Sequence, residues 1–195
     1  MSDHRMAVFW GAHLGSHPSD AEEAKKVGDV IADKGIDVVV GGGDVGLMGV
    51  VSHTAVDKGT GVLGISLRSL YELELTNPRI KEVVVAETLL ERKDIFMERS
   101  DAFIVLPGGV GSLDELAEVM ASNQLGIINK PIGILNTNGY YDDLLSWMKK
   151  AVKEGFISEA NFNELIITDS CEDLIERIII EERPADDDWT NRLGL

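Results

Sequence analysis

Residues 102–112 combine a strand pattern with a glycine-rich turn, an arrangement that suits a phosphate group. An apolar run at 102–106 ends at Pro107-Gly108-Gly109, and a helical pattern opens at Gly111-Ser112. Glycines let backbone N–H groups approach a ligand, and a helix N-terminus carries partial positive charge. The turn lacks the Gly-Lys-Ser/Thr of a Walker A loop. The alternative is a plain strand-to-helix turn that the Ser112 hydroxyl caps, and of the two we favour ligand binding.

Full charges flank this turn on both sides. Arg92 and Lys93 lie in the helical pattern before the strand, and Asp114 and Glu115 follow the turn. The cations could neutralise a phosphate, and Glu115 could present a carboxylate to the ligand. The alternatives are a solvated helix face for the cations and stabilisation of the helix dipole by Glu115.

A second glycine cluster follows an earlier apolar run. Gly41, Gly43 and Gly46 have the spacing G-x-G-x-x-G. A dinucleotide fold places this pattern after its first strand, with an acidic residue about 20 positions later, and neither condition is met here. The glycines therefore indicate either contact with a mononucleotide or a tight turn with close helix packing, and the sequence leaves both open.

Composition excludes several classes of partner. The chain has 195 residues and a formal net charge of −16, which disfavours DNA, RNA and anionic membranes. Cys171 is the only cysteine, so no disulfide can form within the chain. The sequence has neither a signal-peptide pattern nor an apolar stretch long enough for a membrane helix. We therefore expect a cytoplasmic protein that binds a small ligand.

Short apolar runs alternate with helical patterns along the chain. We expect strands at 6–11, 36–40, 62–65, 80–86, 102–106, 132–135 and 165–168. We expect helices at 18–34, 46–58, 88–99, 112–124, 140–154 and 171–181, the first capped by Ser16 or Ser19. This alternation predicts an α/β fold, a parallel sheet with helices on both faces. Residues 1–183 should form a single nucleotide-binding domain with both glycine clusters on its ligand-binding edge, followed by an acidic, mobile tail at 184–195.

Other chemistry-bearing residues have plainer interpretations. His13 and His17 are four apart but lack a nearby third ligand, so we expect solvated loop histidines rather than a metal site. We expect Trp10, Trp147 and Trp189 to be packing residues, and Leu47, Met48 and Met120 to line the core or a pocket.

Residues 8–156 resemble the LOG ("lonely guy") family of cytokinin riboside 5′-monophosphate phosphoribohydrolases, often labelled lysine decarboxylase-like. The resemblance rests on motifs at 41–49 (GGGDVGLMG), 91–93 (ERK) and 107–115 (PGGVGSLDE), with further matches at 124–127, 130–133 and 138–141. Departures from the family pattern include Ser112 in place of threonine, Asp114 in place of a common glutamate, Leu90, and residues 11–16 and 121–123. Several of these fall near the expected base pocket, so the resemblance leaves the nucleobase open.

The resemblance implies a Rossmann-like, doubly wound homodimer that hydrolyses the N-glycosidic bond of AMP or an N6-prenyl-AMP. It implies Arg92 and Glu115 as the catalytic pair, and no metal or redox cofactor. The residues implied to hold the 5′-phosphate are Gly108, Gly109, Gly111 and Ser112. The other substrate-binding candidates are Gly42, Gly43, Glu74, Lys93 and Asp114.

Two alternatives remain. One is a nucleotide or cofactor carrier on the same fold, as in the related molybdenum-cofactor carriers. The other is a pyridoxal-phosphate lysine decarboxylase, for which the sequence shows no lysine in a recognisable Schiff-base context.

Overall fold

Runs of β-branched and other apolar residues form the strands of one parallel sheet. The computed structural model describes residues 4–73 and 75–181, and seven strands lie in these ranges. They are β1 (Arg5–Phe9), β2 (Asp37–Val40), β3 (Val62–Leu67), β4 (Glu82–Ala86), β5 (Ala102–Val105), β6 (Ile132–Leu135) and β7 (Leu165–Thr168). Residues 38–40 and 103–105 are fully buried, because helices cover both faces of a parallel sheet and leave it no polar side.

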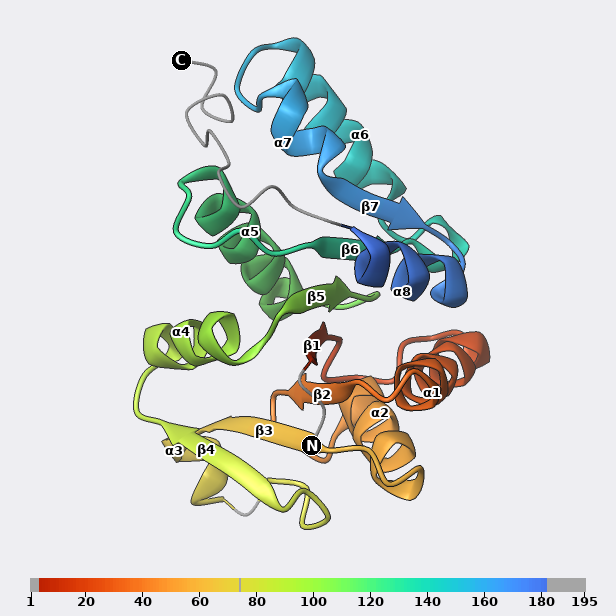
Figure 1. The fold of residues 1–195 in the computed structure, drawn as a ribbon, viewed down its shortest axis with the longest axis vertical. Helices are drawn as coiled ribbons and strands as arrows, with labels where there is room; N and C mark the ends of the chain where they lie inside the picture. Colours follow the sequence, from red (N-terminus) through yellow and green to blue (C-terminus); the bar gives the residue numbers. More distant parts are fainter. Residues whose placement is uncertain (1–3, 74, 182–195) are drawn as a thin grey trace.

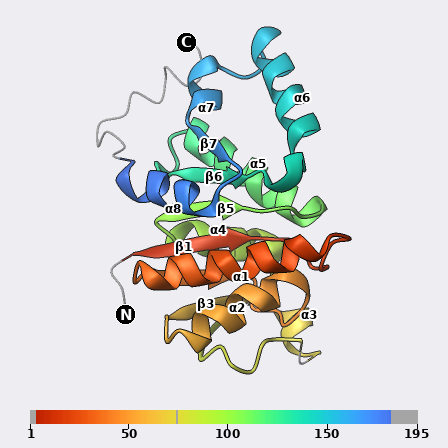
Figure 2. The same cartoon turned by 90° about the vertical axis from the view of Figure 1, so that its right-hand side faces the viewer.

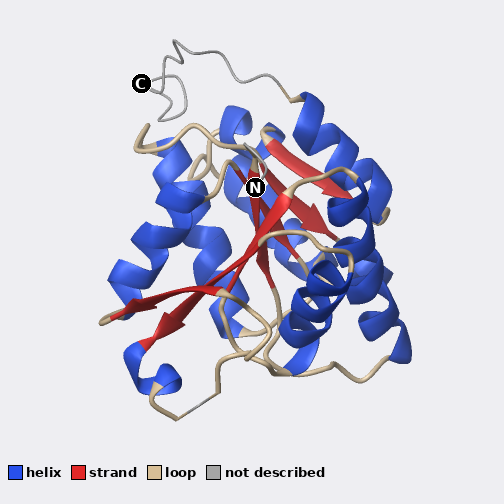
Figure 3. Ribbon diagram, turned by 60° about the horizontal axis from the view of Figure 1, so that its bottom comes forward, coloured by secondary structure: helices blue, strands red, loops and turns tan. Residues whose placement is uncertain are grey.

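Helices flank the sheet in two layers, as Figures 1 and 2 show. The longer ones are α1 (Pro18–Asp33), α2 (Gly46–Asp57), α4 (Leu89–Arg99), α5 (Val110–Gln124), α6 (Asp142–Lys153) and α8 (Cys171–Ile180). Alternate residues of β1 divide the core. Val8 packs in the cluster that includes residues of α1, α2 and α8, and Phe9 packs in the cluster that includes residues of α4, α5 and α6. The predicted α/β fold with helices on both faces is therefore confirmed (Figure 3).

Three short elements were not predicted. They are α3 (Arg68–Tyr71), the 3₁₀ turn η1 (Thr137–Gly139) and α7 (Glu159–Asn163). Segments of three to five residues are too short to show a helical period. The predicted cap of α1 is wrong: His17 occupies the N-cap position without a side-chain bond among the described residues, and Pro18 supplies the first helical position.

Two other expectations concern side chains and the tail. Trp147 was expected to pack, but it is 59% exposed on α6. Glu74, Trp189 and the tail at 184–195 lie outside the described residues. No helix in the described part of the chain is long and apolar enough to span a bilayer.

The strand order creates a crevice at one edge of the sheet. The order is β4-β3-β2-β1-β5-β6-β7, so the chain leaves β1 toward one side and leaves its neighbour β5 toward the other. Ligands of such sheets bind where the connections diverge, beyond the carboxyl ends of the strands. The Gly11 N–H donates to the Pro107 carbonyl over 3.3 Å and joins the two diverging loops. Both glycine clusters follow strands at this edge, as predicted.

Gly46 is required by a close backbone approach. Its φ is +58°, and an added Cβ would lie 2.6 Å from the His13 backbone nitrogen. Gly59 has a similar φ of +80° but no described atom within 4 Å of an added Cβ. We expect Gly59→Ala to cost about 1 kcal/mol from strain alone, and Gly46→Ala on the order of 3–4 kcal/mol because a clash is added. Urea denaturation of both variants measures this difference. Equal losses in the free energy of unfolding would show that the backbone at residues 12–13 moves to accommodate the added Cβ at little cost.

Candidate active site

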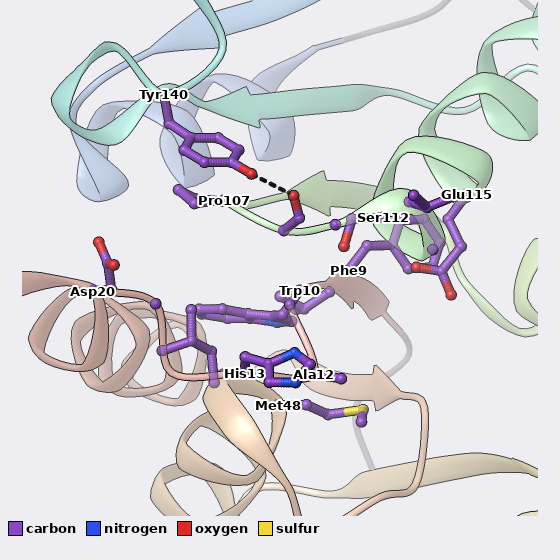
Figure 4. Close-up of a pocket in the computed structure, with 18 of the residues that line it drawn as sticks. Phe9, Trp10, Ala12, His13, Asp20, Met48, Pro107, Ser112, Glu115 and Tyr140 are labelled. Carbon is purple, nitrogen blue, oxygen red and sulfur yellow. Dashed lines mark hydrogen bonds between the residues drawn. The ribbon is translucent and has the colours of Figure 1, made fainter. Parts of the chain in front are cut away.

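A cavity of about 700 Å³ opens at the crevice between β1 and β5. Its size lies within the range of small-ligand pockets. Its walls come from the loops that follow β1, β2, β5 and β6 and from one side each of α2, α4 and α5. Figure 4 shows Tyr140 and Pro107 across the cavity from Trp10 and Met48, with Asp20 on one side and Glu115 on the other.

The glycine turn after β5 presents a helix N-terminus to this cavity. Gly109 is the N-cap, and α5 begins at Val110, two residues before the predicted start. The first intrahelical bond of the turn runs from the Leu113 N–H to the Gly109 carbonyl. Earlier N–H groups have no partner within the helix and remain available to an anion. No described atom lies within 4 Å of an added Cβ at Gly109 or Gly111, so both glycines leave the approach open.

Ser112 does not cap this helix, because Gly109 is the N-cap and Ser112 is the third residue of the first helical turn. Its side chain is buried, and its Oγ has no hydrogen-bond partner among the described residues. Gly108 lies directly against Ser112, so a Cβ at Gly108 would collide with that hydroxyl. Capping of the helix by the Ser112 side chain is therefore wrong, while ligand binding at the turn stays a prediction. Ser112 lines the cavity, but its Oγ is out of contact with solvent, so binding of an anion by this hydroxyl stays a prediction.

Arg92 and Glu115 form an ion pair at the cavity wall. The Arg92 Nη1 lies 3.1 Å from the Glu115 Oε1, and the two side chains are only 15% and 12% exposed. The Arg92 Nε also donates to the Ile65 carbonyl of β3 over 3.0 Å. The guanidinium carbon stands 4.9 Å from the centre of the Phe96 ring, a cation–π distance. α4 and α5 thus bring together, in a fixed geometry, two residues that were predicted as a pair.

Burial raises the pKa of Glu115 above the ordinary glutamate value, and the Arg92 charge opposes that rise. The carboxylate therefore sits in a partly dehydrated site where it interacts strongly with any positive charge in the cavity. Such an environment is typical of functional carboxylates, although structural ion pairs share it.

Lys93 and Asp114 lie outside the set of cavity-lining residues. The Lys93 Nζ is 3.3 Å from the Asp114 Oδ1 and 2.9 Å from the Glu118 Oε2, which ties α4 to α5. The bond to Glu118 is the main factor that raises the pKa of Lys93. Glu118 was not predicted as functional, and its one signal in the sequence is a position one helical turn after Asp114. Substrate contact by Lys93 or Asp114 stays a prediction.

The second glycine cluster contributes Gly41 to the cavity, but not the predicted Gly42 and Gly43. Gly42 packs beside Gly64 at a φ of +77°, and Gly43 pairs with Thr76 in an isolated bridge. A Cβ at Gly41 would lie 2.5 Å from the Arg92 Nη2. Gly41 therefore leaves room for the guanidinium. Substrate binding by Gly42 and Gly43 stays a prediction.

Several residues in or directly beside the cavity wall were not predicted as functional. The Tyr140 hydroxyl donates to the Gly108 carbonyl over 2.6 Å, and the Tyr141 hydroxyl donates to the Leu106 carbonyl over 2.7 Å. These two bonds fix the end of β5 and the start of the glycine turn. Both tyrosines belong to the 138–141 match, the only signal for them in the sequence. The exposed loop histidines, His13 and His17, also line the cavity.

Comparison with known proteins gives concordant results. Residues 48–178 match a family model described as "Possible lysine decarboxylase". Two relatives are cytokinin riboside 5′-monophosphate phosphoribohydrolases of Arabidopsis thaliana, LOG7 and LOG4. The chain is 41% identical to LOG7 over 97% of this chain and 87% of the relative, and 44% identical to LOG4 over 84% and 76%.

Solved structures share the fold. A molybdenum cofactor binding protein from Rippkaea orientalis has a TM-score of 0.69 and 26% identity, covering 92% of this chain and 97% of that one. The molybdenum cofactor carrier protein of Chlamydomonas reinhardtii has a TM-score of 0.68 with 14% identity, over 92% and 100% of the two chains, and so supports the fold alone.

Proposed function

We propose a substrate and a mechanism for this chain, which belongs to the LOG family of cytokinin riboside 5′-monophosphate phosphoribohydrolases. The protein is a hydrolase of the N-glycosidic bond of a nucleoside 5′-monophosphate, and it releases the free base and ribose 5-phosphate. The substrates we propose are AMP and N6-prenylated AMP. The observation that carries the mechanism is the buried Arg92–Glu115 pair, which shares one cavity with the open N-terminus of α5.

In this mechanism the 5′-phosphate binds the N–H groups at the start of α5 and the Ser112 hydroxyl. Anchoring the phosphate positions the ribose beside Glu115. The bond between C1′ and the base nitrogen breaks and leaves an oxocarbenium-like cation, which the Glu115 carboxylate stabilises. Water adds its oxygen to C1′ and gives one proton to Glu115, which passes it through solvent to the departing base, so that the base leaves neutral and Glu115 is again ionised. Arg92 orients the carboxylate and keeps it ionised.

A direct test compares AMP and isopentenyl-AMP with adenosine. We expect free base from both nucleotides, and for adenosine a kcat/KM at least about 100-fold lower, since binding energy from the phosphate is lost at the transition state. Chromatography of the released base measures all three rates. Equal rates on AMP and adenosine would remove the role assigned to the glycine turn.

Two alternatives have weaker support. A non-catalytic carrier is supported by its relatives of the same fold. However, a buried carboxylate beside the anion site lowers stability through desolvation and repels an anionic ligand, which disfavours a protein that only binds such a ligand. Tight nucleotide binding without turnover would favour it. A pyridoxal-phosphate decarboxylase needs a lysine for its Schiff base, and the described residues that line the cavity include no lysine.

We also propose that the protein is a cytoplasmic homodimer. Support for the dimer comes from an apolar groove of about 530 Å³ between α5, α6 and α7, lined by residues that include Leu113, Met120 and the exposed Trp147. We expect light scattering to give about twice the chain mass of 21.2 kDa, and a Trp147→Glu variant to shift the mass toward one chain, because a charge in an apolar interface is costly. A single-chain mass for the unmodified protein would contradict the dimer.

A further inference from the structure

Three buried polar atoms around one small void lack partners. They are the Trp10 Nε1, the Glu23 Oε1 and the Thr137 Oγ1, and none has a hydrogen-bond partner among the described residues. All three residues line a void of about 10 Å³ beside the main cavity, together with Asp20, Leu47, Leu106 and Pro107. A buried polar atom without a hydrogen-bond partner lowers the free energy of unfolding. Three such atoms beside one void therefore indicate a bound molecule that forms hydrogen bonds with them.

We propose that this void is a binding site for one structural water molecule. Its volume matches the minimum that holds a water, and a buried water commonly makes two to four hydrogen bonds. The donor pattern also fits. The indole N–H can only donate, the Glu23 carboxylate can only accept, and the hydroxyl can do either. One water can accept from Trp10 and donate to Glu23 and Thr137, which satisfies all three atoms.

The three atoms are out of contact with solvent, so they cannot bind a ligand in the open cavity without moving. This separates the water site from the nucleotide site, even though Trp10, Asp20 and Thr137 line both spaces. Figure 4 shows the Trp10 ring along one wall of the main cavity, facing Pro107 and Tyr140. The water therefore lies behind a wall that the substrate touches from the other side.

Three separate segments meet at this water. Trp10 directly follows β1, Glu23 lies in α1 one turn after Asp20, and Thr137 begins η1. η1 leads directly to Tyr140, whose hydroxyl bonds the glycine turn. We infer that the bridged water fixes the orientation of the Trp10 ring relative to the glycine turn. Glu23 and Thr137 are then positioning residues, and Trp10 helps to determine which base fits; this part rests on the proposed function.

The water itself is tested by a high-resolution crystal structure of the full chain. We expect one ordered water within hydrogen-bond distance of the Trp10 Nε1, the Glu23 Oε1 and the Thr137 Oγ1. Direct bonds among these atoms, or an empty void, would overturn the proposal. This result is independent of the reaction.

Variants at Glu23 test the consequence. Glu23→Met removes the acceptor, Glu23→Gln retains one, and Glu22→Met removes the same charge from the neighbouring exposed position as a matched control. We expect Glu23→Met to lower the Tm by about 4–8 °C relative to Glu22→Met, because methionine cannot accept from the water and leaves the water site one charge-assisted hydrogen bond short. Glu23→Gln should restore most of that loss. Equal Tm values for Glu23→Met and Glu22→Met would overturn the proposal.

Kinetics separate a positioning role from a stability role. We expect Glu23→Met to raise KM for AMP by roughly three- to tenfold with kcat unchanged, because ground-state and transition-state binding weaken together. Unchanged KM in a folded Glu23→Met protein would overturn the positioning role. If the unmodified protein does not hydrolyse AMP, the proposed function fails, while the crystallographic and thermal results still decide the water site.

Discussion

Replacing Glu115 with glutamine is expected to lower kcat for AMP hydrolysis by about 10³-fold, or roughly 4 kcal/mol of transition-state stabilisation. The amide keeps the size of the side chain but cannot balance a cationic sugar or accept the proton of water. The phosphate contacts are untouched, so nucleotide binding should remain close to that of the unmodified protein. Single-turnover release of adenine, with binding measured by calorimetry, checks both expectations.

The matched control is Glu118→Gln on the same helix. Glu118 bonds Lys93 and lies outside the set of cavity-lining residues, so the same change of charge should leave kcat within about twofold, as expected for a substitution remote from the reaction. A similar loss of kcat in both variants would point to a general effect of helix charge, and full activity in Glu115→Gln would remove the assigned mechanism.

The fold follows from the sequence because its strands are buried on both faces. Runs such as 36–40 and 102–106 are short, rich in β-branched residues and followed by glycine or proline, which favours interior strands. The start of α5 was harder to place, because Val110 and Gly111 are weak helix formers that tertiary context holds in the first turn. The exposure of Trp147 was also not predicted, because periodicity identifies an apolar helix face but does not show whether another element covers it.

The sequence predicts the candidate active site only in part. The Arg92–Glu115 pair could be proposed from motifs, but its geometry depends on how α4 packs against β3 and α5. The Lys93–Glu118 bond joins two helices, so sequence spacing carries no sign of it. Trp10, Glu23 and Thr137 lie on three segments far apart in the chain, and only the folded structure brings their polar atoms around one void.

Replacing Arg92 with methionine is expected to lower kcat/KM at neutral pH by about 10²-fold or more and to change the pH profile. Catalysis needs the ionised Glu115. Burial already raises its pKa above 4.5, and Arg92 is the largest factor that holds it down. Without Arg92 the pKa rises further, so a larger fraction of the carboxyl is protonated at a given pH. The acid limb of the kcat/KM profile should therefore move to higher pH, with partial recovery of activity above it.

Arg92→Lys separates the charge of the guanidinium from its geometry. A lysine keeps a positive charge near Glu115, but its single ammonium group cannot reproduce the planar arrangement in which the guanidinium donates to both the Ile65 carbonyl and the Glu115 carboxylate. Its acid limb should stay close to that of the unmodified protein while kcat falls, whereas the methionine variant should show both changes. If the acid limb of Arg92→Met coincides with that of the unmodified protein, the ionisation of Glu115 does not depend on Arg92, and the guanidinium acts on the substrate phosphate instead.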